Sequence, residues 1–311
     1  MLSDAILFPQ PGQIAVRRIG LREPEAGDVR VAVEYCGIST GTERLLFTGD
    51  MPPFPGLGYP LVPGYEAVGQ VVETFGDGDL SAGDRVFVPG SNGFVDARGL
   101  FGASASQLLA PARRVTRVPE SMGADAVLLA LAATAHHAIV AADAIPELII
   151  GHGVLGRLSA RIAVALGGSP IVWEIEPRRH GGADGYAVCH PSDDERSDYG
   201  AILDVSGAGD ILDLLIPRLA RGGEIVLAGF YKVPLSFAFP PAFMREARIR
   251  VAAEWLPADM EAVTRLVAEG RLSLAGLVTH RHGPAKAGEA YRTAFEDVSC
   301  LKMILEWGAT Q

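Results

Sequence analysis

Short runs of alternating or wholly apolar residues occupy the first 118 positions of the chain. The runs read AILF, IAVRRI, DVRVAVEYCGI, AVGQVVETF and DRVFVPG, and Gly, Pro and Asp separate them. This pattern is typical of short strands joined by turns, so it predicts an antiparallel sheet or a barrel. Residues 52–64 interrupt the pattern with five Pro and three Gly. That composition excludes a helix and predicts a rigid, extended loop.

The hydrophobic period changes near residue 120. Apolar positions three and four apart predict helices in residues 119–142, 152–168 and 210–223. The short apolar runs ELIIG, PIVWE, YAVCH, AILDVSG and EIVLAGF lie around these helices and predict strands. Strands that alternate with helices indicate a parallel sheet covered by helices. The sheet has little room for its crossovers, so we expect one or two crossover helices to be short or replaced by loop.

Composition and charge narrow the function classes. The chain has 27 Lys and Arg against 37 Asp and Glu, a net charge of −10 and a pI near 5.2, which argues against a nucleic-acid binder. Cys36, Cys189 and Cys300 lie far apart, so we expect reduced thiols and neither disulfides nor a structural zinc site. The N-terminus lacks the pattern of a signal peptide. We therefore expect a cytoplasmic protein whose apolar window, residues 126–142, is a buried helix.

The segment GHGVLG at residues 151–156 has the G-x-G-x-x-G spacing of a dinucleotide-binding turn. An apolar strand precedes it and a helix follows, as this motif requires. Gly151 allows the tight turn, and Gly156 lets the helix pack closely on the strand. Gly153 lets a pyrophosphate approach the positive end of the helix. We expect a dinucleotide cofactor at this turn.

Glu174 decides the expected cofactor. It closes the next strand, 21 residues after Gly153, where a carboxylate accepts hydrogen bonds from the ribose hydroxyls and repels a 2′-phosphate. We therefore expect NAD. Arg178 and Arg179 argue for NADP if their loop folds back. The remaining expected cofactor contacts are Val154, Leu155, Ser206, Gly229 and Thr134.

Two segments of the β-rich part, CGISTGTE at residues 36–43 and PGYE at residues 63–66, resemble the medium-chain dehydrogenase/reductase superfamily. In that superfamily a G-[IV]-C segment and a G-H-E segment provide a Cys and a His that bind a catalytic zinc. Ser39 and Tyr65 stand at those two positions here, and Ala130 stands at the position of the third ligand. The stretch that would hold a four-cysteine zinc lobe has no cysteine. We therefore expect the fold of the superfamily without its metal.

The resemblance also implies the domain organisation. It implies an α/β protein with a Rossmann-type, doubly wound parallel sheet and a β-rich, barrel-like (GroES-like) substrate domain. We place the catalytic domain at residues 1–125 and 257–311 and the dinucleotide-binding domain at residues 126–256. An amphipathic helix in DMEAVTRLVAEG then precedes the segments that return to the first domain.

Longer segments resemble the bacteriochlorophyllide a dehydrogenases (3-hydroxyethyl bacteriochlorophyllide a dehydrogenases) of photosynthetic bacteria. These segments include PPFPGLGYPLVPGYE, LALAATAHHA, LSFAFPPAFMREARIRVAAEW and FEDVSCLKMILEW. The resemblance implies a hydride transfer to NAD that converts the 3-(1-hydroxyethyl) group of a magnesium tetrapyrrole to 3-acetyl, late in bacteriochlorophyll synthesis for photosynthesis. The implied partner is this bacteriochlorophyllide substrate. A homodimer and a peripheral association with the membrane pigment machinery stay open.

Oxidation of an alcohol without zinc needs a side chain that accepts the hydroxyl proton. Tyr65 is the first candidate, because a phenol beside a positively charged nicotinamide has its pKa lowered from about 10 toward neutral pH. A Tyr65 that only stacks on the macrocycle or packs in the core is the alternative. The other polar candidates are Ser39, Thr40, Glu43, Glu66, His136 and His137.

The remaining candidates have structural alternatives. His136 and His137 are neighbours on a predicted helix and face different sides, so at most one of them points into a cleft. Glu66 is either catalytic or a buried, hydrogen-bonded carboxylate. The residues that could line an apolar slot for the macrocycle are Phe47, Phe54, Leu57, Tyr59, Phe94 and Phe101, and the basic segment with Arg245, Arg248 and Arg250 fits a solvated or interface edge.

Two other functions fit parts of the pattern. One is a zinc-free NADPH-dependent quinone or enoyl reductase of the same superfamily, which needs no alcohol base, but Glu174 argues against NADPH. The other is a pigment-binding protein that keeps the Rossmann domain only as architecture. The intact glycines of the turn argue against that interpretation.

Overall fold

The computed structural model describes residues 1–142 and 144–308, which form two compact units. Unit 1 consists of Met1–Ala130 and Ala275–Gln311, and unit 2 of Leu131–Leu274. The predicted boundary at residue 256 differs from this division. Residues 257–274 belong to unit 2, because the Asp259 carboxylate is hydrogen-bonded to the helix that precedes the parallel sheet. In addition, the Arg271 guanidinium donates to the Ala165 carbonyl at 2.6 Å.

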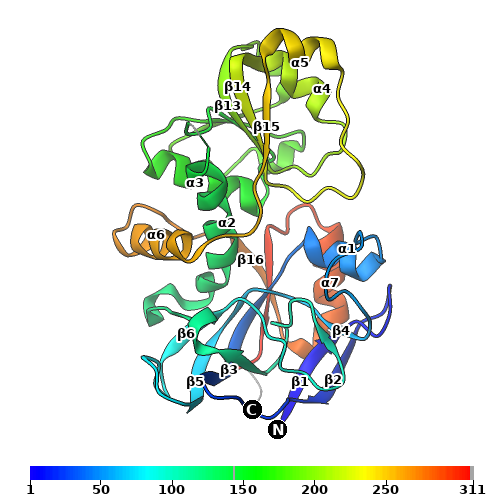
Figure 1. The fold of residues 1–311 in the computed structure, drawn as a ribbon, viewed down its shortest axis with the longest axis vertical. Coiled ribbons are helices and arrows are strands. Elements are labelled where there is room, and N and C mark those ends of the chain that lie inside the picture. The colour runs from blue at the N-terminus through cyan, green and yellow to red at the C-terminus, as the bar shows by residue number, and fades with distance from the viewer. Residues whose placement is uncertain (143, 309–311) are drawn as a thin grey trace. The chain divides into compact units, whose positions relative to one another are not determined.

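Unit 1 is built on a mixed seven-stranded sheet (Figure 1). Its strand order is β16-β17-β3-β5-β6-β9, and β8 also pairs with β3. These strands are β3 (Asp28–Ile38), β5 (Ala67–Phe75), β6 (Arg85–Val88), β8 (Gln107–Pro111), β9 (Thr116–Arg117), β16 (Val278–His282) and β17 (Lys302–Glu306). Most pairs are antiparallel, as predicted, but β16 and β17 run parallel. The C-terminal segment thus completes the sheet of the N-terminal one.

Two small sheets and short helices complete unit 1. The strands are β1 (Leu2–Leu7) with β2 (Ala15–Gly20), and β4 (Leu61–Val62) with β7 (Arg98–Gly99). The helices are α1 (Thr42–Thr48) and α7 (Ala287–Glu296), with the 3-10 helices η1 (Ala112–Arg114), η2 (Glu120–Leu128) and η6 (Pro284–Lys286). The Pro-rich loop contains no helix, as predicted, and only β4 interrupts it.

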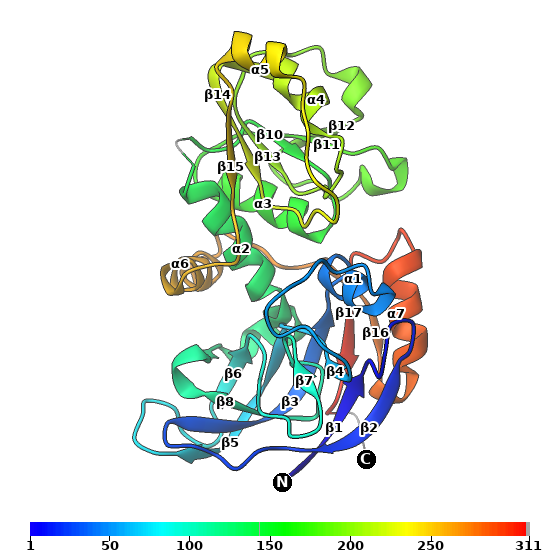
Figure 2. The ribbon, with the colours of Figure 1, turned by 45° about the vertical axis from the view of Figure 1, so that its right-hand side comes forward.

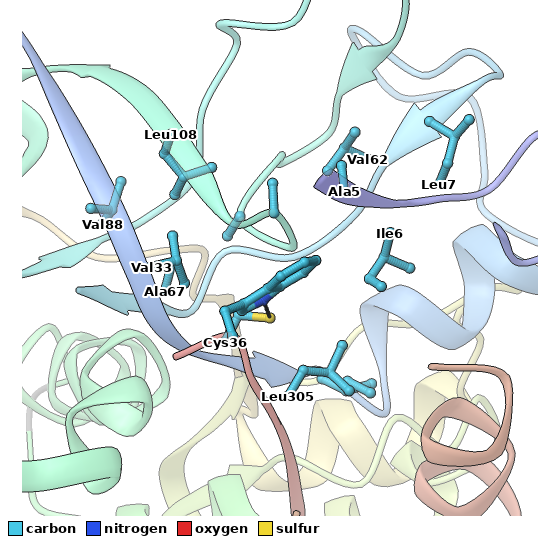
Figure 3. Close-up of a cluster of buried hydrophobic side chains, with 14 of the residues drawn as sticks. Ala5, Ile6, Leu7, Val33, Cys36, Val62, Ala67, Val88, Leu108 and Leu305 are labelled. Carbon is cyan, nitrogen blue, oxygen red and sulfur yellow. Dashed lines mark hydrogen bonds between the residues drawn. The ribbon is translucent and has the colours of Figure 1, made fainter. Parts of the chain in front are cut away.

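Alternation along the strands fills the core of unit 1. In β3, Val29, Val31 and Val33 are buried, and the residues between them are partly exposed. Side chains from β1, β3 and β17, among them Ile6, Cys36 and Leu305, lie together in the same interior (Figure 3). The core therefore joins residues from both ends of the chain.

Unit 2 contains a six-stranded parallel sheet of order β12-β11-β10-β13-β14-β15 (Figure 2). Its strands are β10 (Leu148–Ile150), β11 (Ile171–Trp173), β12 (Ala187–Cys189), β13 (Tyr199–Asp204), β14 (Leu219–Leu227) and β15 (Arg248–Val251). The order reverses between β10 and β13, which confirms the predicted doubly wound sheet.

The connections of unit 2 follow the prediction except at residues 210–223, where the helical turns end at Arg218 and residues 219–223 already belong to β14. The helices are α2 (Leu129–Val140), α3 (Val154–Ala165), α4 (Leu212–Leu215), α5 (Phe239–Arg245) and α6 (Pro257–Ala268). The 3-10 helices are η3 (Pro177–Arg179), η4 (Pro191–Asp193) and η5 (Ile216–Arg218). Only the single turns η3 and η4 connect β11, β12 and β13, so two crossovers lack an α-helix.

The apolar segment at residues 119–142 forms η2 followed by α2. Gly123, with φ +51°, separates the first turns from the rest. The segment Glu120–Val140 is long and apolar enough to span a membrane, but 72% of its apolar window is buried inside the protein. This burial agrees with the predicted core helix.

Candidate functional site

The turn between β10 and α3 has the geometry of an anion-binding loop. Gly151 has φ +99°, a left-handed conformation that favours glycine. A Cβ at Gly156 would lie 1.8 Å from the Gly151 carbonyl oxygen, so no larger residue fits there. At Gly153, the residue before α3, a Cβ would meet only Arg179 Nη1, at 3.9 Å. The start of this helix is therefore open, and its N–H groups fit a pyrophosphate.

The other expected cofactor contacts divide into two groups. Val154 and Leu155 form the first turn of α3, where Val154 is buried and Leu155 is partly exposed. Ser206 and Gly229 follow β13 and β14, so they lie at the same carboxyl edge of the sheet as the glycine turn. Thr134 instead lies partly buried in α2.

Glu174 lies beside the glycine turn, immediately after β11. Its buried carboxylate accepts hydrogen bonds from the backbone N–H groups of His152 and Glu176, both at 2.9 Å. Each carboxylate oxygen keeps acceptor capacity beyond one such bond. The loop after Glu174 does fold back toward the turn, because Arg179 lies next to Gly153. The Arg178 guanidinium, however, is held by the Glu176 carboxylate at 2.9 and 3.0 Å.

His152 and Arg157 fasten this loop to the turn, and no sequence motif marked them. Burial lowers the pKa of His152 to about 4, so its ring is neutral at pH 7. Its Nδ1 donates to the Arg179 carbonyl at 2.6 Å, and its Nε2 accepts from the Tyr186 hydroxyl at 2.8 Å. The buried Arg157 guanidinium donates to the carbonyls of His152 and Arg179. The loop therefore has a fixed path beside the cofactor turn.

A pair of hydroxyl groups lies in unit 1, one on the segment that follows β3 and the other on the segment that follows β4. The Ser39 Oγ and the Tyr65 hydroxyl are 2.6 Å apart. Ser39 is buried, whereas Tyr65 is partly exposed and packs edge-on against Phe101, with ring centroids 5.4 Å apart. Burial and the nearby Glu66 carboxylate raise the pKa of Tyr65 above its ordinary value. The pKa is raised because the surroundings of the phenol in unit 1 are apolar and negative. The predicted lowering concerns a phenol beside a nicotinamide and stays a prediction.

Glu66 lies in the interior of unit 1. It is fully buried, and both carboxylate oxygens accept hydrogen bonds from Lys302 Nζ, at 2.6 and 2.9 Å. Lys302 also donates to the Ile38 carbonyl at 3.3 Å. A Cβ at Gly37 would lie 2.0 Å from Glu66 Oε2, so Gly37 makes room for the carboxylate. This geometry is the buried, hydrogen-bonded carboxylate of the alternative interpretation, and its partner Lys302 had no signal in the sequence.

Glu43 is a second buried carboxyl group, and it fixes the backbone of Ser39. Its Oε1 accepts from the Ser39 N–H at 2.8 Å, and its Oε2 accepts from the Tyr291 hydroxyl at 2.6 Å. Burial raises the pKa of Glu43 to about 7, although both hydrogen bonds act in the opposite direction. Thr40, another candidate, is partly exposed. Glu43 thus holds the position of the Ser39 hydroxyl.

The two histidines share one carboxylate instead of facing different sides. His136 Nδ1 lies 2.7 Å from Asp259 Oδ1, and His137 Nδ1 lies 2.9 Å from Asp259 Oδ2. Asp259 also accepts from the Leu256 N–H at the start of α6. The expectation that their rings diverge is wrong, because a single carboxylate from α6 reaches both. Through Asp259 the pair joins α2 to α6.

Comparison with known proteins identifies the family. Residues 25–120 match the family described as the alcohol dehydrogenase GroES-like domain. A protein of Cereibacter sphaeroides named 2-desacetyl-2-hydroxyethyl bacteriochlorophyllide A dehydrogenase is 53% identical over 317 residues, with 100% of both chains covered. A protein of the same name from Rhodobacter capsulatus is 54% identical over 310 residues, with 99% of both chains covered. The chain belongs to this family of medium-chain dehydrogenases. It is an oxidoreductase that acts on a CH–OH group.

Solved structures agree with this dehydrogenase fold. The 2R,3R-butanediol dehydrogenase of Bacillus subtilis superposes with a TM-score of 0.83 at 20% identity, covering 98% of this chain and 99% of the other. The L-idonate 5-dehydrogenase of Escherichia coli gives a TM-score of 0.85 at 16% identity, covering 98% of both chains. At these identities the likeness concerns the fold alone.

The donor set of the dehydrogenase does not fit a catalytic zinc ion. Ser39 and Tyr65 offer hydroxyl groups, and the buried Ala130 offers no donor. Zinc prefers thiolate, imidazole and carboxylate ligands. Among residues 1–142 and 144–308, no group of three or more His, Cys, Asp or Glu side chains could hold a metal ion.

Proposed function

We propose that the dehydrogenase oxidises the hydroxyethyl group of a bacteriochlorophyllide to an acetyl group, with NAD as hydride acceptor. The substrate assignment is supported by the sequence identity of 53–54%, over whole chains, to the two relatives that are named for this reaction. The glycine turn of unit 2 supports the cofactor, and the Ser39–Tyr65 hydroxyl pair of unit 1 supports the alcohol chemistry. In the reaction the carbinol carbon loses a hydride and the hydroxyl loses a proton.

We assign the proton transfer to Tyr65, with Ser39 as its hydrogen-bond partner. The phenol is protonated at neutral pH within unit 1, because burial raises its pKa. A bound oxidised nicotinamide would supply the hydride acceptor and a positive charge, which would lower the pKa of a phenol close to it. Ser39 Oγ, at 2.6 Å from the phenol oxygen, stabilises the phenolate by donating to it.

Replacement of the phenol oxygen tests this assignment. In Tyr65→Phe the ring keeps its contact with Phe101, but the titrating oxygen is gone, so kcat should fall by about 10² to 10⁴. The Kd of the pigment should change little, and the ascending limb of the pH profile should disappear. Ser39→Ala removes only the hydrogen-bond partner of the phenol, so kcat should fall less than in Tyr65→Phe. Near-normal turnover of Tyr65→Phe would remove Tyr65 from the chemistry.

We propose NAD rather than NADP because of the charge and position of Glu174. Its carboxylate lies at the glycine turn, held by the His152 N–H, and a 2′-phosphate near it meets a buried negative charge. The preference for NAD in kcat/KM should be tens- to hundreds-fold, roughly 2 to 3 kcal/mol. Glu174→Ser should narrow the preference, while the control variant Glu195→Ser, an exposed change in the same unit, should leave it unchanged. Equal wild-type efficiency with NADP would overturn this proposal.

We further propose that the dehydrogenase is a cytoplasmic homodimer that associates through β15 and α5. The strand β15 ends the parallel sheet, and the side chains of Phe239, Phe243, Met244 and Val251 around it are 67–73% exposed. An edge strand beside exposed aromatic residues is an association surface. Light scattering should give the mass of two chains, and Phe243→Asp should give one. A monomeric wild type that instead sediments with anionic vesicles would assign this surface to a membrane.

A further inference from the structure

A row of three aromatic rings leads from the hydroxyl pair of unit 1 to the surface. Tyr65 packs edge-on against Phe101, with centroids 5.4 Å apart and planes at 88°, and Phe101 packs against Phe54, at 6.4 Å and 66°. The inner end of the row carries the hydroxyl that contacts Ser39. The outer end, Phe54, is 36% exposed.

Two rings of the row, Phe101 and Phe54, belong to the larger set of residues that was predicted to line an apolar slot. Phe94 is buried, and Phe47, Leu57 and Tyr59 are partly buried against the core of unit 1. Phe101 is also partly buried against that core, so it is anchored. For Phe54 the ring contact is with Phe101. The ring of Phe54 therefore presents apolar surface to solvent beside a fixed aromatic neighbour.

An arginine lies on the segment that contains Phe101 and beside the loop that contains Phe54. Arg98, three residues before Phe101, begins β7, and its N–H donates to the Pro60 carbonyl at 2.8 Å. A Cβ at Gly58, in the loop that carries Phe54, would lie 3.5 Å from Arg98 Cγ and 3.6 Å from Arg98 Nε. The exposed guanidinium has no ion pair within the described part of the chain. A cation thus borders the loop that ends the aromatic row.

We infer that Tyr65, Phe101 and Phe54 form an aromatic row that selects apolar alcohols, with the exposed ring of Phe54 stacking on a flat ligand, and that Arg98 binds a carboxylate on the same ligand. This inference rests on the proposed function and adds which residues recognise the substrate. A tetrapyrrole offers a planar ring system of matching chemistry, and a chlorophyllide also has a free propionate. Aromatic contacts supply affinity for the ring, whereas the guanidinium distinguishes an acid from its neutral ester.

Equilibrium binding of the hydroxyethyl bacteriochlorophyllide and of its methyl ester tests both parts. Phe54→Ala should weaken binding of both ligands by about tenfold, the size of one lost stacking contact. Arg98→Gln should weaken binding of the acid by about threefold at low salt and leave the ester unchanged, since exposed ion pairs are weak and screened. Both effects should be in Kd and KM, with kcat conserved.

Matched controls are available in the same unit. Val72, on β5, is 40% exposed and lies outside the row, so Val72→Ala should bind both ligands as the wild type does. Arg44 is an exposed arginine on α1, and Arg44→Gln should keep the preference for the acid. Unchanged affinity in Phe54→Ala would overturn the role of the aromatic row, and equal losses for acid and ester in Arg98→Gln would overturn the carboxylate contact. A wild type that neither binds nor oxidises the pigment would instead overturn the proposed function.

Discussion

The buried Glu43 should make the stability of unit 1 depend on pH in an unusual direction. Its pKa is raised by burial from the ordinary 4.5 to about 7 in the folded protein. Between these values the folded state keeps a proton that the unfolded chain has lost, so the free energy of unfolding falls as pH rises. Each pH unit of this interval is worth about 1.4 kcal/mol, so the total loss is about 3 kcal/mol by pH 7 to 8.

Glu43→Gln removes the titration and keeps the shape. The amide oxygen accepts from the Ser39 N–H, as Oε1 of Glu43 does at 2.8 Å. The amide nitrogen donates to the Tyr291 oxygen, and the Tyr291 O–H turns to Ser104, which already shares a hydrogen bond with it. The variant should match the wild type near pH 4.5 and exceed it by up to about 3 kcal/mol at pH 8.

Urea unfolding from pH 4.5 to 8.5 measures the difference. Trp307, buried in unit 1 and bonded to Cys36 Sγ at 3.2 Å, reports this unit in a background of Trp173→Phe and Trp255→Phe. The difference between wild type and variant isolates Glu43, since other groups titrate equally in both. Glu296→Gln, an exposed change on α7, should leave the wild-type curve unaltered. Parallel curves for Glu43→Gln and wild type would refute the buried, neutral-range carboxyl.

Other changes have equally definite outcomes. Lys302→Met leaves the Glu66 carboxylate buried without its partner and should cost about 3 to 5 kcal/mol in urea unfolding, and adding Glu66→Leu should restore most of it. Gly156→Ala places a Cβ 1.8 Å from the Gly151 carbonyl, so the fluorescence of added NADH should show an affinity at least about tenfold weaker. Gly288→Ala, on α7 with nothing within 4 Å of the new Cβ, should keep that affinity. Elemental analysis should find less than one zinc per chain, and activity should survive chelation; one tightly held zinc whose removal abolishes activity would contradict the donor set.

Local rules account for the parts of the fold that the sequence predicted. The glycine turn depends on three residues within six positions: Gly151 has a left-handed backbone, Gly156 allows close packing, and Gly153 leaves the start of the helix open. The parallel sheet follows from alternating strands and helices, and even the missing crossover helices follow from the few residues available. These features depend on neighbours along the chain, and such neighbours are known from the sequence.

The domain boundary and the histidine pair show where local rules end. The helix α6 has an ordinary amphipathic pattern that suits either unit. Its assignment to unit 2 depends on Asp259, which lies 123 residues from His136 in the chain and 2.7 Å from it in the structure. A contact of this kind depends on how distant elements pack.

The sequence by itself determined the two-part organisation, the glycine turn and the hydroxyl groups of Ser39 and Tyr65 where related dehydrogenases have zinc ligands. Only the tertiary structure decided what surrounds those two hydroxyl groups. Lys302 reaches Glu66 across 236 positions, and Tyr291 reaches Glu43 across 248. Both partners come from the C-terminal segment, whose strand β17 pairs with β3 beside the site. The role of a carboxyl group depends on its hydrogen-bond partner and on its burial. Both are set by the packing of distant segments, and neither can be derived from residue type and spacing.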